Sequence, residues 1–426
     1  MTTIELGRHD ERTGCDRVGR DAPTPGDLTS RWRARMCLGT GFAMAVATTL
    51  DGPLPWPVVR AAVILVVCAA VGRAGPRIGA RARSALGLVL GLAATVFGAG
   101  VGVPNLMKQP AGPVCVFGLI TLAGGFAMSV DAIVGIVRGC RWWTKTVTVT
   151  SLAALAVVFG VPATFALVNS DVPPIPLGDR TPASVGLEFD EIVLTTDDDV
   201  DLDAWYVPSR NGAAVVLLAG AGSTRSDEVD RAAAVARHGY GVLLLDVRGH
   251  GGSGGEAMLL GWYGERDVRP AIDWLLDLTD IDDDRIGVVG MSMGGQQAVA
   301  AFGADHRIRA AVADGVVGRH TSELSASDPV DELMGRLMMI ATAAMTSAPH
   351  PTPLRAAVQS AAPNRLLVIA GERVGLERDF AQELAEASPQ SVEVWVAPDS
   401  GHTEGFDRHP AEWEQRVVGF LDTNLV

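Results

Sequence analysis

The sequence has 426 residues, of which 48% are hydrophobic and 20% charged, and its mean hydropathy is +0.24. This composition is too apolar for disorder and too charged for a chain wholly embedded in a membrane, so we expect two parts of different character. Residues 1–169 carry 16 Arg and Lys against 8 Asp and Glu, so their net charge is +8. Because the whole chain has a net charge of −14, the remaining residues have a net charge of −22. So acidic a second part argues against a nucleic-acid partner, whose phosphates are bound by clustered Lys and Arg.

The cysteines are confined to the first part of the chain and show no paired C-x-x-C spacing: Cys15, Cys37, Cys68, Cys115 and Cys140. Disulfides and thiolate metal sites are therefore not expected in the second part.

A multi-pass membrane region is predicted over residues 36–170. Three uncharged runs, 84–107, 109–130 and 146–170, are each long enough to cross a hydrocarbon core of ~30 Å, which needs about 20 residues. The runs 36–50 and 52–72 are shorter or interrupted by an arginine and prolines. We predict that these two form a short hairpin of two spans; the alternative is one interfacial or re-entrant segment.

Basic residues predict the orientation of these spans, because Lys and Arg collect on the cytoplasmic side. They precede span one, separate spans two and three, and separate spans four and five: Arg31, Arg33 and Arg35; Arg73, Arg77, Arg81 and Arg83; Arg138, Arg141 and Lys145. The intervening loops carry only Asp51 and Lys108. The pattern predicts five spans, a cytoplasmic tail over residues 1–35 without a cleavable signal peptide, and an extracytoplasmic domain after residue 170. Four spans would place that domain in the cytoplasm.

Asp131 is an acidic residue inside the fourth apolar segment. Such a residue can mark an ion path, but it can also lie near a helix end or pair with a neighbouring helix, which we favour. One acid gives little support to a transporter.

After a proline-rich linker over residues 171–184, residues 185–426 alternate between strand and helix patterns. Strands are predicted at 187–195, 201–208, 213–219, 241–246, 285–291, 310–314, 366–370 and 391–397, and helices at 227–238, 265–278, 294–302, 378–387 and 411–421. A hairpin followed by βαβ units predicts an α/β domain with a mostly parallel sheet covered by helices on both faces.

An Asp-rich segment, 197–203, is similar to the start of a calcium loop. With Asp199 as position one, position six is Ala204 instead of Gly and position twelve is Arg210 instead of Glu. We therefore predict a solvated hairpin turn.

The chemistry is predicted from a G-x-S-x-G sequence, Gly290-Met-Ser-Met-Gly294, which directly follows an apolar strand and opens a small-residue helix. A nucleophile elbow needs this arrangement, because its serine occupies a sharp strand-to-helix turn that tolerates only small flanking residues. Ser292 is thus the candidate nucleophile, and the N–H of Met293 the candidate oxyanion donor.

With these residues the chain resembles the α/β-hydrolase superfamily of serine hydrolases over residues 185–426. The segment 217–225 is similar to the family's oxyanion loop, which implies the Ala221 N–H as second oxyanion donor. Ala219 stands where the family usually has His, so the bracing of this loop departs from the family's pattern. The segment Asp246-Val-Arg-Gly-His-Gly-Gly-Ser253 is similar to the family's D-x-R-G-x-G-x-S turn.

A nucleophilic serine needs a base to accept its proton and an acid to orient that base. The resemblance implies His402 as the base, since it follows the last strand, while His250 is interpreted as a turn residue. The family's usual acid position is Val374 here, so Glu372 and Glu377 are the candidates. Asp314, after the preceding strand, is a less usual alternative.

The leading hypothesis is a membrane-anchored serine hydrolase acting on an ester, thioester or amide through an acyl-enzyme on Ser292, with an esterase or lipase favoured over a peptidase. A lid is predicted over residues 316–364, whose Met-rich stretch suits a greasy, lipid-like acyl substrate or simply packs on the sheet. No metal or organic cofactor is expected, and the oligomeric state stays open. The alternative from another class is a catalytically silent domain acting as a membrane-tethered binding module.

Overall fold

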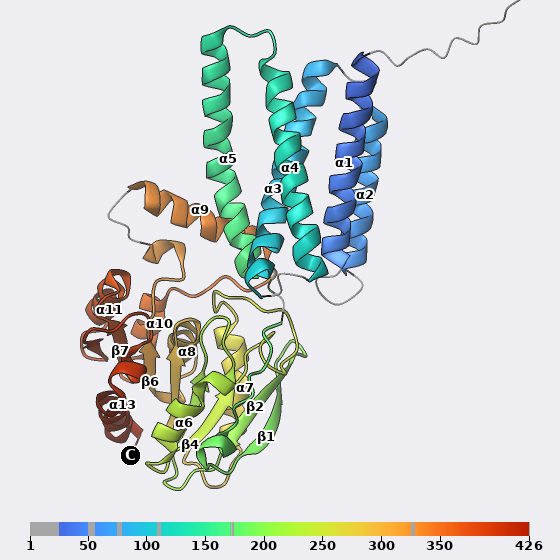
Figure 1. The fold of residues 1–426 in the computed structure, drawn as a ribbon. Helices are drawn as coiled ribbons and strands as arrows, with labels where there is room; N and C mark the ends of the chain where they lie inside the picture. The colour runs from blue at the N-terminus through green and yellow to red at the C-terminus, as the bar shows by residue number, and fades with distance from the viewer. Residues whose placement is uncertain are drawn as a thin grey trace, which may run out of the picture.

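The computed structural model of the protein describes residues 25–49, 56–74, 79–108, 112–170, 172, 174–324 and 329–425. An N-terminal bundle of helices is followed by a domain built around a central sheet (Figure 1). The bundle helices are α1 (Pro25–Thr49), α2 (Trp56–Ala74), α3 (Ala80–Lys108), α4 (Pro113–Val137) and α5 (Trp142–Ser170). The starts of α1, α3 and α5 lie at the end of the bundle away from the sheet domain (Figure 1).

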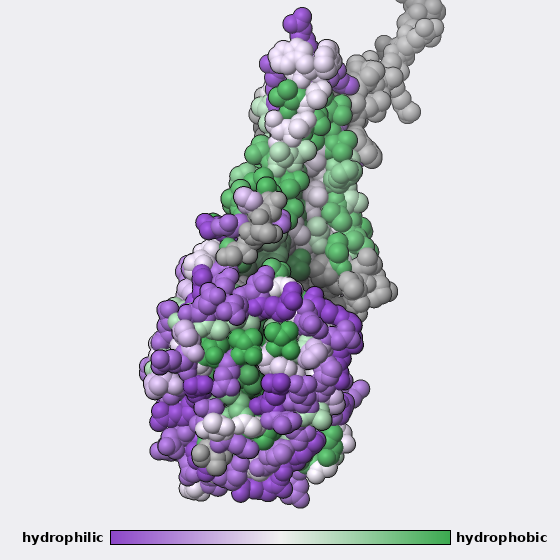
Figure 2. Space-filling view, turned by 90° about the vertical axis from the view of Figure 1, so that its left-hand side faces the viewer, coloured by the Kyte–Doolittle hydropathy of each residue, from purple (hydrophilic) through white to green (hydrophobic). Residues whose placement is uncertain are grey.

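Three bundle helices are long and apolar enough to cross a membrane. Their apolar segments are Ala80–Val103, Pro113–Val137 and Trp142–Ser170. In α1 the apolar segment is shorter, Arg35–Ala47. Hydrophobic surface follows the length of the bundle, whereas the sheet domain is mostly hydrophilic (Figure 2). The structure thus forms helices over all five predicted runs, and three have the length and composition of spans among the residues that it describes.

Helix α1 begins at Pro25 instead of at the predicted Met36, so residues 25–35 belong to a helix and not to the tail. The added turns bring Arg33 beside Asp131 of α4, with Nε 2.7 Å from Oδ2. Asp131 therefore pairs with a neighbouring helix, the interpretation that the sequence favoured. Residues 1–24 of the predicted tail lie outside the described residues.

The second part contains one sheet of eight strands in the order β1-β2-β4-β3-β5-β6-β7-β8. The pairs β1–β2 and β2–β4 are antiparallel, and all others are parallel. The strands are β1 (Asp190–Thr195), β2 (Asp201–Val207), β3 (Ala214–Leu218), β4 (Gly241–Leu245), β5 (Ile286–Met291), β6 (Ile308–Asp314), β7 (Arg365–Gly371) and β8 (Val392–Ala397). Each lies at its predicted position, within a few residues at the ends.

Helices cover both faces of the sheet, because alternate strand residues point to opposite sides. Val216 and Leu218 of β3 pack into one core and Val215 and Leu217 into the other. The first core is closed by α7 (Gly264–Leu276), α8 (Met293–Ala304), α10 (Leu354–Ala361) and α11 (Gly375–Ala387). The second is closed mainly by α6 (Val229–Ala236), which follows η3 (Arg225–Glu228), and by α13 (Pro410–Leu425), which follows α12 (Gly405–Arg408).

The predicted linker 171–184 is docked on the sheet domain. Ile175 is buried, its N–H donates to the carbonyl of Gly249, and its own carbonyl accepts from Gly251. The 3-10 helix η2 (Pro182–Val185) follows. The segment therefore fixes the end of the helix bundle against the loop that follows β4.

The predicted lid, 316–364, contains two helices and the 3-10 helix η4 (Thr321–Glu323) with different surroundings. Helix α10 packs on α8, where a Cβ on Gly303 would lie 2.5 Å from the Cα of Ala357, so α10 belongs to the core. Helix α9 (Pro329–Met345) lies against α5 of the bundle (Figure 1). The prediction of a lid over the whole of this segment is thus corrected, because α10 belongs to the core of the sheet domain. Residues 325–328 lie outside the described residues.

Candidate active site

The turn between β5 and α8 has the geometry of a nucleophile elbow. Ser292 occupies it with φ 53° and ψ −113°, a backbone region that side chains rarely enter. Its N–H donates to the carbonyl of Asp314 at 2.7 Å, so β6 holds the turn. Strain of this kind persists only where its surroundings fix it, and it is typical of functional sites.

Both glycines of the G-x-S-x-G sequence are required by close backbone contacts. A Cβ on Gly290 would lie 2.1 Å from the carbonyl oxygen of Gly294, and one on Gly294 would lie 2.5 Å from that of Ala219. The elbow thus packs against the neighbouring strand and loop without room for a side chain.

We expect Gly290→Ala to lower the free energy of unfolding of the sheet domain by about 3 kcal/mol, the upper end for overpacking of a tight core. Gly419→Ala in α13 is the matched control, because a Cβ there meets no atom within 4 Å. It should be neutral, or stabilising by up to about 1 kcal/mol. Thermal unfolding of both variants checks this, and equal melting temperatures would contradict it.

Ser292, His402 and Glu377 form a hydrogen-bonded triad. Nε2 of His402 lies 2.8 Å from Oγ of Ser292, and Nδ1 lies 2.5 Å from Oε1 of Glu377. A proton on Nδ1 would be donated to the carboxylate, which leaves Nε2 to accept from the serine hydroxyl. The hydrogen bond that Glu377 accepts from His402 raises the pKa of the histidine, because it stabilises the imidazolium.

Glu377 is held for this role by the first turn of α11. Its side chain is 1% exposed, and Oε2 accepts the N–H of Gly371 at 2.9 Å. A carboxylate in the first turn of a helix is also favoured by the helix dipole. Glu372, the other predicted acid, points elsewhere, since its Oε2 accepts the N–H of Asp399 at 2.7 Å. Of the two predicted acids, the structure thus places Glu377 and not Glu372 against His402.

Asp314, the third candidate acid, lies buried at the end of β6. Burial raises its pKa to about 7, against the opposing effect of Arg231. The histidine's carboxylate contact is made by Glu377, whereas Asp314 contributes its main-chain carbonyl to the elbow. Its pKa would keep it largely neutral below pH 7, as expected of a carboxyl removed from water.

The segment predicted as an oxyanion loop lies beside the serine. A Cβ on Gly220 would be 3.4 Å from the Cβ of Ser292, which places Ala221 next to the elbow. Met293 is the first residue of α8, and the first N–H groups of a helix have no acceptor within it. Both residues predicted to supply oxyanion donors thus lie near Ser292.

Arg225, at the end of this loop, holds the loop in place, which the apolar side chain of Ala219 cannot do. Its N–H donates to Oδ1 of Asp246 at 2.6 Å, its guanidinium pairs with the same carboxyl, and its Cζ lies 4.5 Å from the ring centre of Trp205. Burial raises the pKa of Asp246 to about 6 even with Arg225 beside it. Asp246 begins the turn that resembles the family's D-x-R-G-x-G-x-S sequence, so that turn anchors the loop.

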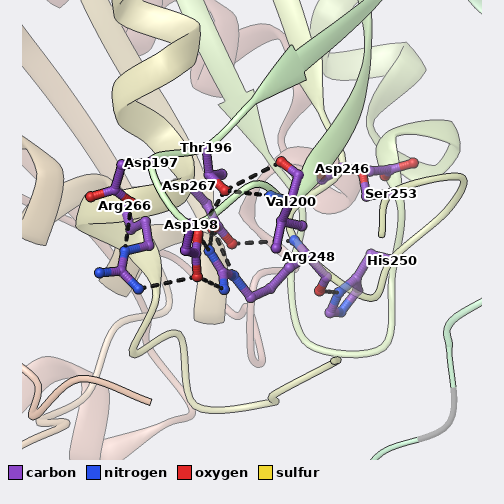
Figure 3. A network of polar contacts seen from close by, with 10 residues as sticks. All are labelled: Thr196, Asp197, Asp198, Val200, Asp246, Arg248, His250, Ser253, Arg266 and Asp267. Atoms are coloured by element: carbon purple, nitrogen blue, oxygen red, sulfur yellow. Dashed lines mark hydrogen bonds and ion pairs between the residues drawn. The ribbon is translucent and has the colours of Figure 1, made fainter. Parts of the chain in front are cut away.

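The arginine of the same turn, Arg248, joins three segments (Figure 3). It pairs with Asp267 of α7 at 2.7 Å and with Asp198 of the β1–β2 turn at 3.0 Å, and it stacks 4.0 Å from the ring centre of Tyr263. The hydrogen bond from Arg248 holds the pKa of Asp198 well below its usual range. Residues 197–200 do form the predicted hairpin turn and residues 201–203 begin β2, but Asp198 is bound in a network and is not simply solvated.

We expect Arg248→Met to lower the free energy of unfolding by about 3–5 kcal/mol, since it leaves the buried Asp267 carboxyl without its partner. Arg269→Met is the control, because Arg269 is 71% exposed and 4.0 Å from Asp273, a pair worth about 0.5 kcal/mol. Urea unfolding of both variants tests this, and a loss below about 1 kcal/mol for Arg248→Met would contradict it.

His250, the other histidine interpreted from the sequence, lies outside the triad. His250 is buried in the turn after β4, with Nδ1 3.0 Å from the carbonyl of Arg248, in keeping with its predicted turn position. Over the described ranges, no three His, Cys, Asp or Glu residues are grouped so that they could hold a metal ion.

Known proteins resemble the sheet domain. A family model described as X-Pro dipeptidyl-peptidase (S15 family) matches residues 195–324, which contain Ser292 but end before Glu377 and His402. Among solved structures, a Pyrococcus furiosus esterase is 26% identical with a TM-score of 0.50, covering 60% of this chain and 98% of the esterase.

Two curated relatives match shorter stretches. An uncharacterized Mycobacterium tuberculosis protein is 36% identical over 112 residues, which cover 26% of this chain and 39% of that protein. The alpha/beta hydrolase domain-containing protein WAV2 of Arabidopsis thaliana is 30% identical over 119 residues, 27% of this chain and 38% of WAV2. The chain thus spans less than half the length of these relatives. Together with the mostly parallel sheet, the likenesses show that the second part has the α/β-hydrolase fold and support a hydrolase of that type.

Proposed function

We propose that the protein is a membrane-anchored serine hydrolase that cleaves an ester bond through an acyl-enzyme on Ser292. The observation that carries the proposal is the hydrogen-bonded row from Ser292 through His402 to the buried Glu377. A serine hydroxyl becomes nucleophilic when a base accepts its proton, and this row supplies the base and its orienting acid.

In the proposed mechanism, Oγ of Ser292 attacks the substrate carbonyl while Nε2 of His402 takes its proton. Glu377 stabilises the imidazolium, and the N–H groups of Met293 and Ala221 donate to the oxyanion of the tetrahedral intermediate. The histidine returns the proton to the leaving alcohol, which departs as the acyl-enzyme forms. Water, deprotonated by His402, then releases the acid and restores the serine.

Fluorophosphonate labelling of the detergent-solubilised protein tests the nucleophile. Wild type should be labelled at Ser292, and His402→Ala should not react, because its serine lacks a base. A folded wild type that resists labelling would instead support the silent binding module. Turnover of p-nitrophenyl esters of graded chain length, measured in parallel, would begin to define the acyl group.

A serine peptidase is the second candidate, favoured by the match to the X-Pro dipeptidyl-peptidase family model over residues 195–324. The same triad would attack an amide in the same way. Turnover of an X-Pro-p-nitroanilide in preference to p-nitrophenyl esters would favour the peptidase. The likeness to an esterase over 98% of that enzyme's length leads us to favour ester cleavage.

We further propose five spans with the hydrolase domain outside the cytoplasm. Helices α1, α3 and α5 begin at the bundle end away from that domain (Figure 1). Basic residues lie in the first half of α1, in the first turn of α3 and directly before α5: Arg33 and Arg35, Arg81 and Arg83, and Arg141. Such residues collect on the cytoplasmic side. Protease added to spheroplasts should digest residues 171–426, and protection of this segment would place the domain in the cytoplasm.

A further inference from the structure

The helix bundle carries an apolar groove of about 870 Å³. It runs between α3 and α5, with Val96, Ala99, Phe159 and Ala163 among its lining residues, and Met338 of α9 at one end. The volume lies within the ~300–1,000 Å³ typical of ligand sites.

The groove has three polar lining residues, Thr95, Thr164 and Asn169, and two of them donate hydrogen bonds within their own helices. Oγ1 of Thr95 donates to the carbonyl of Gly91 at 2.7 Å, and Nδ2 of Asn169 donates to that of Phe165 at 2.8 Å. A polar ligand would lose its hydrogen bonds to water here and gain few in return, which is costly. An apolar occupant incurs no such cost.

One end of the groove leads toward the serine. The carbonyl of Asn169, a groove residue, accepts the N–H of Leu259 at 2.9 Å, and two residues later a Cβ on Gly261 would lie 3.1 Å from the carbonyl oxygen of Met293. Because Met293 directly follows Ser292, these contacts and the reach of the chain limit the distance from this end of the groove to the serine to roughly 20 Å.

Helix α9 adds an apolar surface beside the groove, to which it contributes Met338. It lies across α5 between the bundle and the sheet domain (Figure 1). Leu333 and Ile340, seven residues apart and so on one helix face, are 56% and 57% exposed. An amphipathic helix beside membrane spans lies in the interface with its apolar face toward the acyl chains.

We propose that the groove between α3 and α5 holds an acyl chain of a bilayer lipid, so that the lipid's ester reaches Ser292 at the membrane surface beneath α9. The proposal rests on the proposed function and names its substrate class. In a bilayer the hydrocarbon that meets α3 and α5 is lipid, since both helices have the length and hydropathy of spans. The groove then opens directly onto its occupant.

Ala163→Phe fills the groove, and Ala153→Phe places the same side chain on an exposed position of α5 outside it. In phosphatidylcholine nanodiscs, Ala163→Phe should lower kcat/KM for p-nitrophenyl palmitate about tenfold, the loss expected from unburying about two methylene groups. Turnover of p-nitrophenyl acetate should not change. Ala153→Phe should alter neither ester, and Ala99→Phe should repeat the effect from α3. Equal loss on both esters, or none, would overturn the proposal.

Photocrosslinking provides a readout that needs no turnover. With a diazirine-bearing phosphatidylcholine in nanodiscs of Ser292→Ala, the peptide containing Ala163 should be labelled several-fold more than the peptide containing Ala153. The added Ala163→Phe should remove the excess. Equal labelling would overturn the groove proposal even if esters are hydrolysed, whereas groove labelling of an enzyme that hydrolyses no ester would contradict only the proposed function.

Discussion

Ser292→Ala is expected to lower kcat/KM for p-nitrophenyl esters by about 10⁴-fold or more, with the protein still folded. The remaining backbone donors can stabilise an oxyanion but cannot form an acyl-enzyme, and loss of a triad serine in other hydrolases has effects of about this size. Steady-state kinetics on the purified protein measure the change. Ser184→Ala, in the exposed 3-10 helix before the sheet, is the control and should retain full activity.

The same prediction has a non-additive component. His402→Ala should cost about as much as Ser292→Ala, and the double variant should be no slower than either, because the two side chains act as a unit. A double variant whose loss equals the product of the single losses would contradict the joint role assigned to this pair.

Glu377→Gln is expected to lower kcat by about 10⁴-fold, the size seen when a triad carboxylate becomes an amide. The amide can donate to Nδ1, which would favour the wrong tautomer of His402, and it cannot stabilise the imidazolium. Glu372→Gln is the matched control, since that carboxylate accepts a main-chain N–H instead of contacting the histidine. A large loss in Glu372→Gln with activity retained in Glu377→Gln would contradict the assignment.

The pH dependence gives Glu377→Gln a second signature. In wild type, kcat/KM should fall as the pH drops below the pKa of His402, because the protonated imidazole cannot act as a base. The hydrogen bond that Glu377 accepts from the histidine raises that pKa. Its removal should therefore move the acid limb of the residual activity to lower pH. A limb that stays in place would show that the carboxylate does not act on the histidine.

The sheet domain was largely predictable because its signals are local. Short β-rich runs of five to nine residues predicted each strand. The glycines around Ser292 predicted the elbow for a steric reason that the contact distances bear out. The sequence pattern did not predict helix α10, because its apolar positions, such as Leu354 and Val358, lie inside the long segment predicted as a lid.

The acid could not be chosen from sequence because its position depends on a helix start. Val374 occupies the family's usual position, and Glu377 reaches His402 because α11 begins at Gly375 and turns the Glu377 side chain inward while Leu376 stays exposed. The signal that could have separated Glu377 from Glu372 is helical spacing, since Glu377 shares a face with the buried Phe380, Ala381 and Leu384.

Contacts between residues far apart in the chain could not be predicted from the sequence either. The pairing of Arg33 with Asp131 joins residues far apart in the chain, and the docking of Ile175 on the turn after β4 converts an apparent linker into a fixed connection. Both depend on tertiary packing, which no local pattern records.

The most direct test of the proposed function is the mass of the acyl-enzyme itself. Wild type mixed rapidly with a p-nitrophenyl ester and quenched in acid should gain the mass of one acyl group, and peptide mapping should locate it on Ser292. Ser292→Ala should gain none. Ester turnover without an acylated serine, or an acyl group that maps to another residue, would contradict the mechanism.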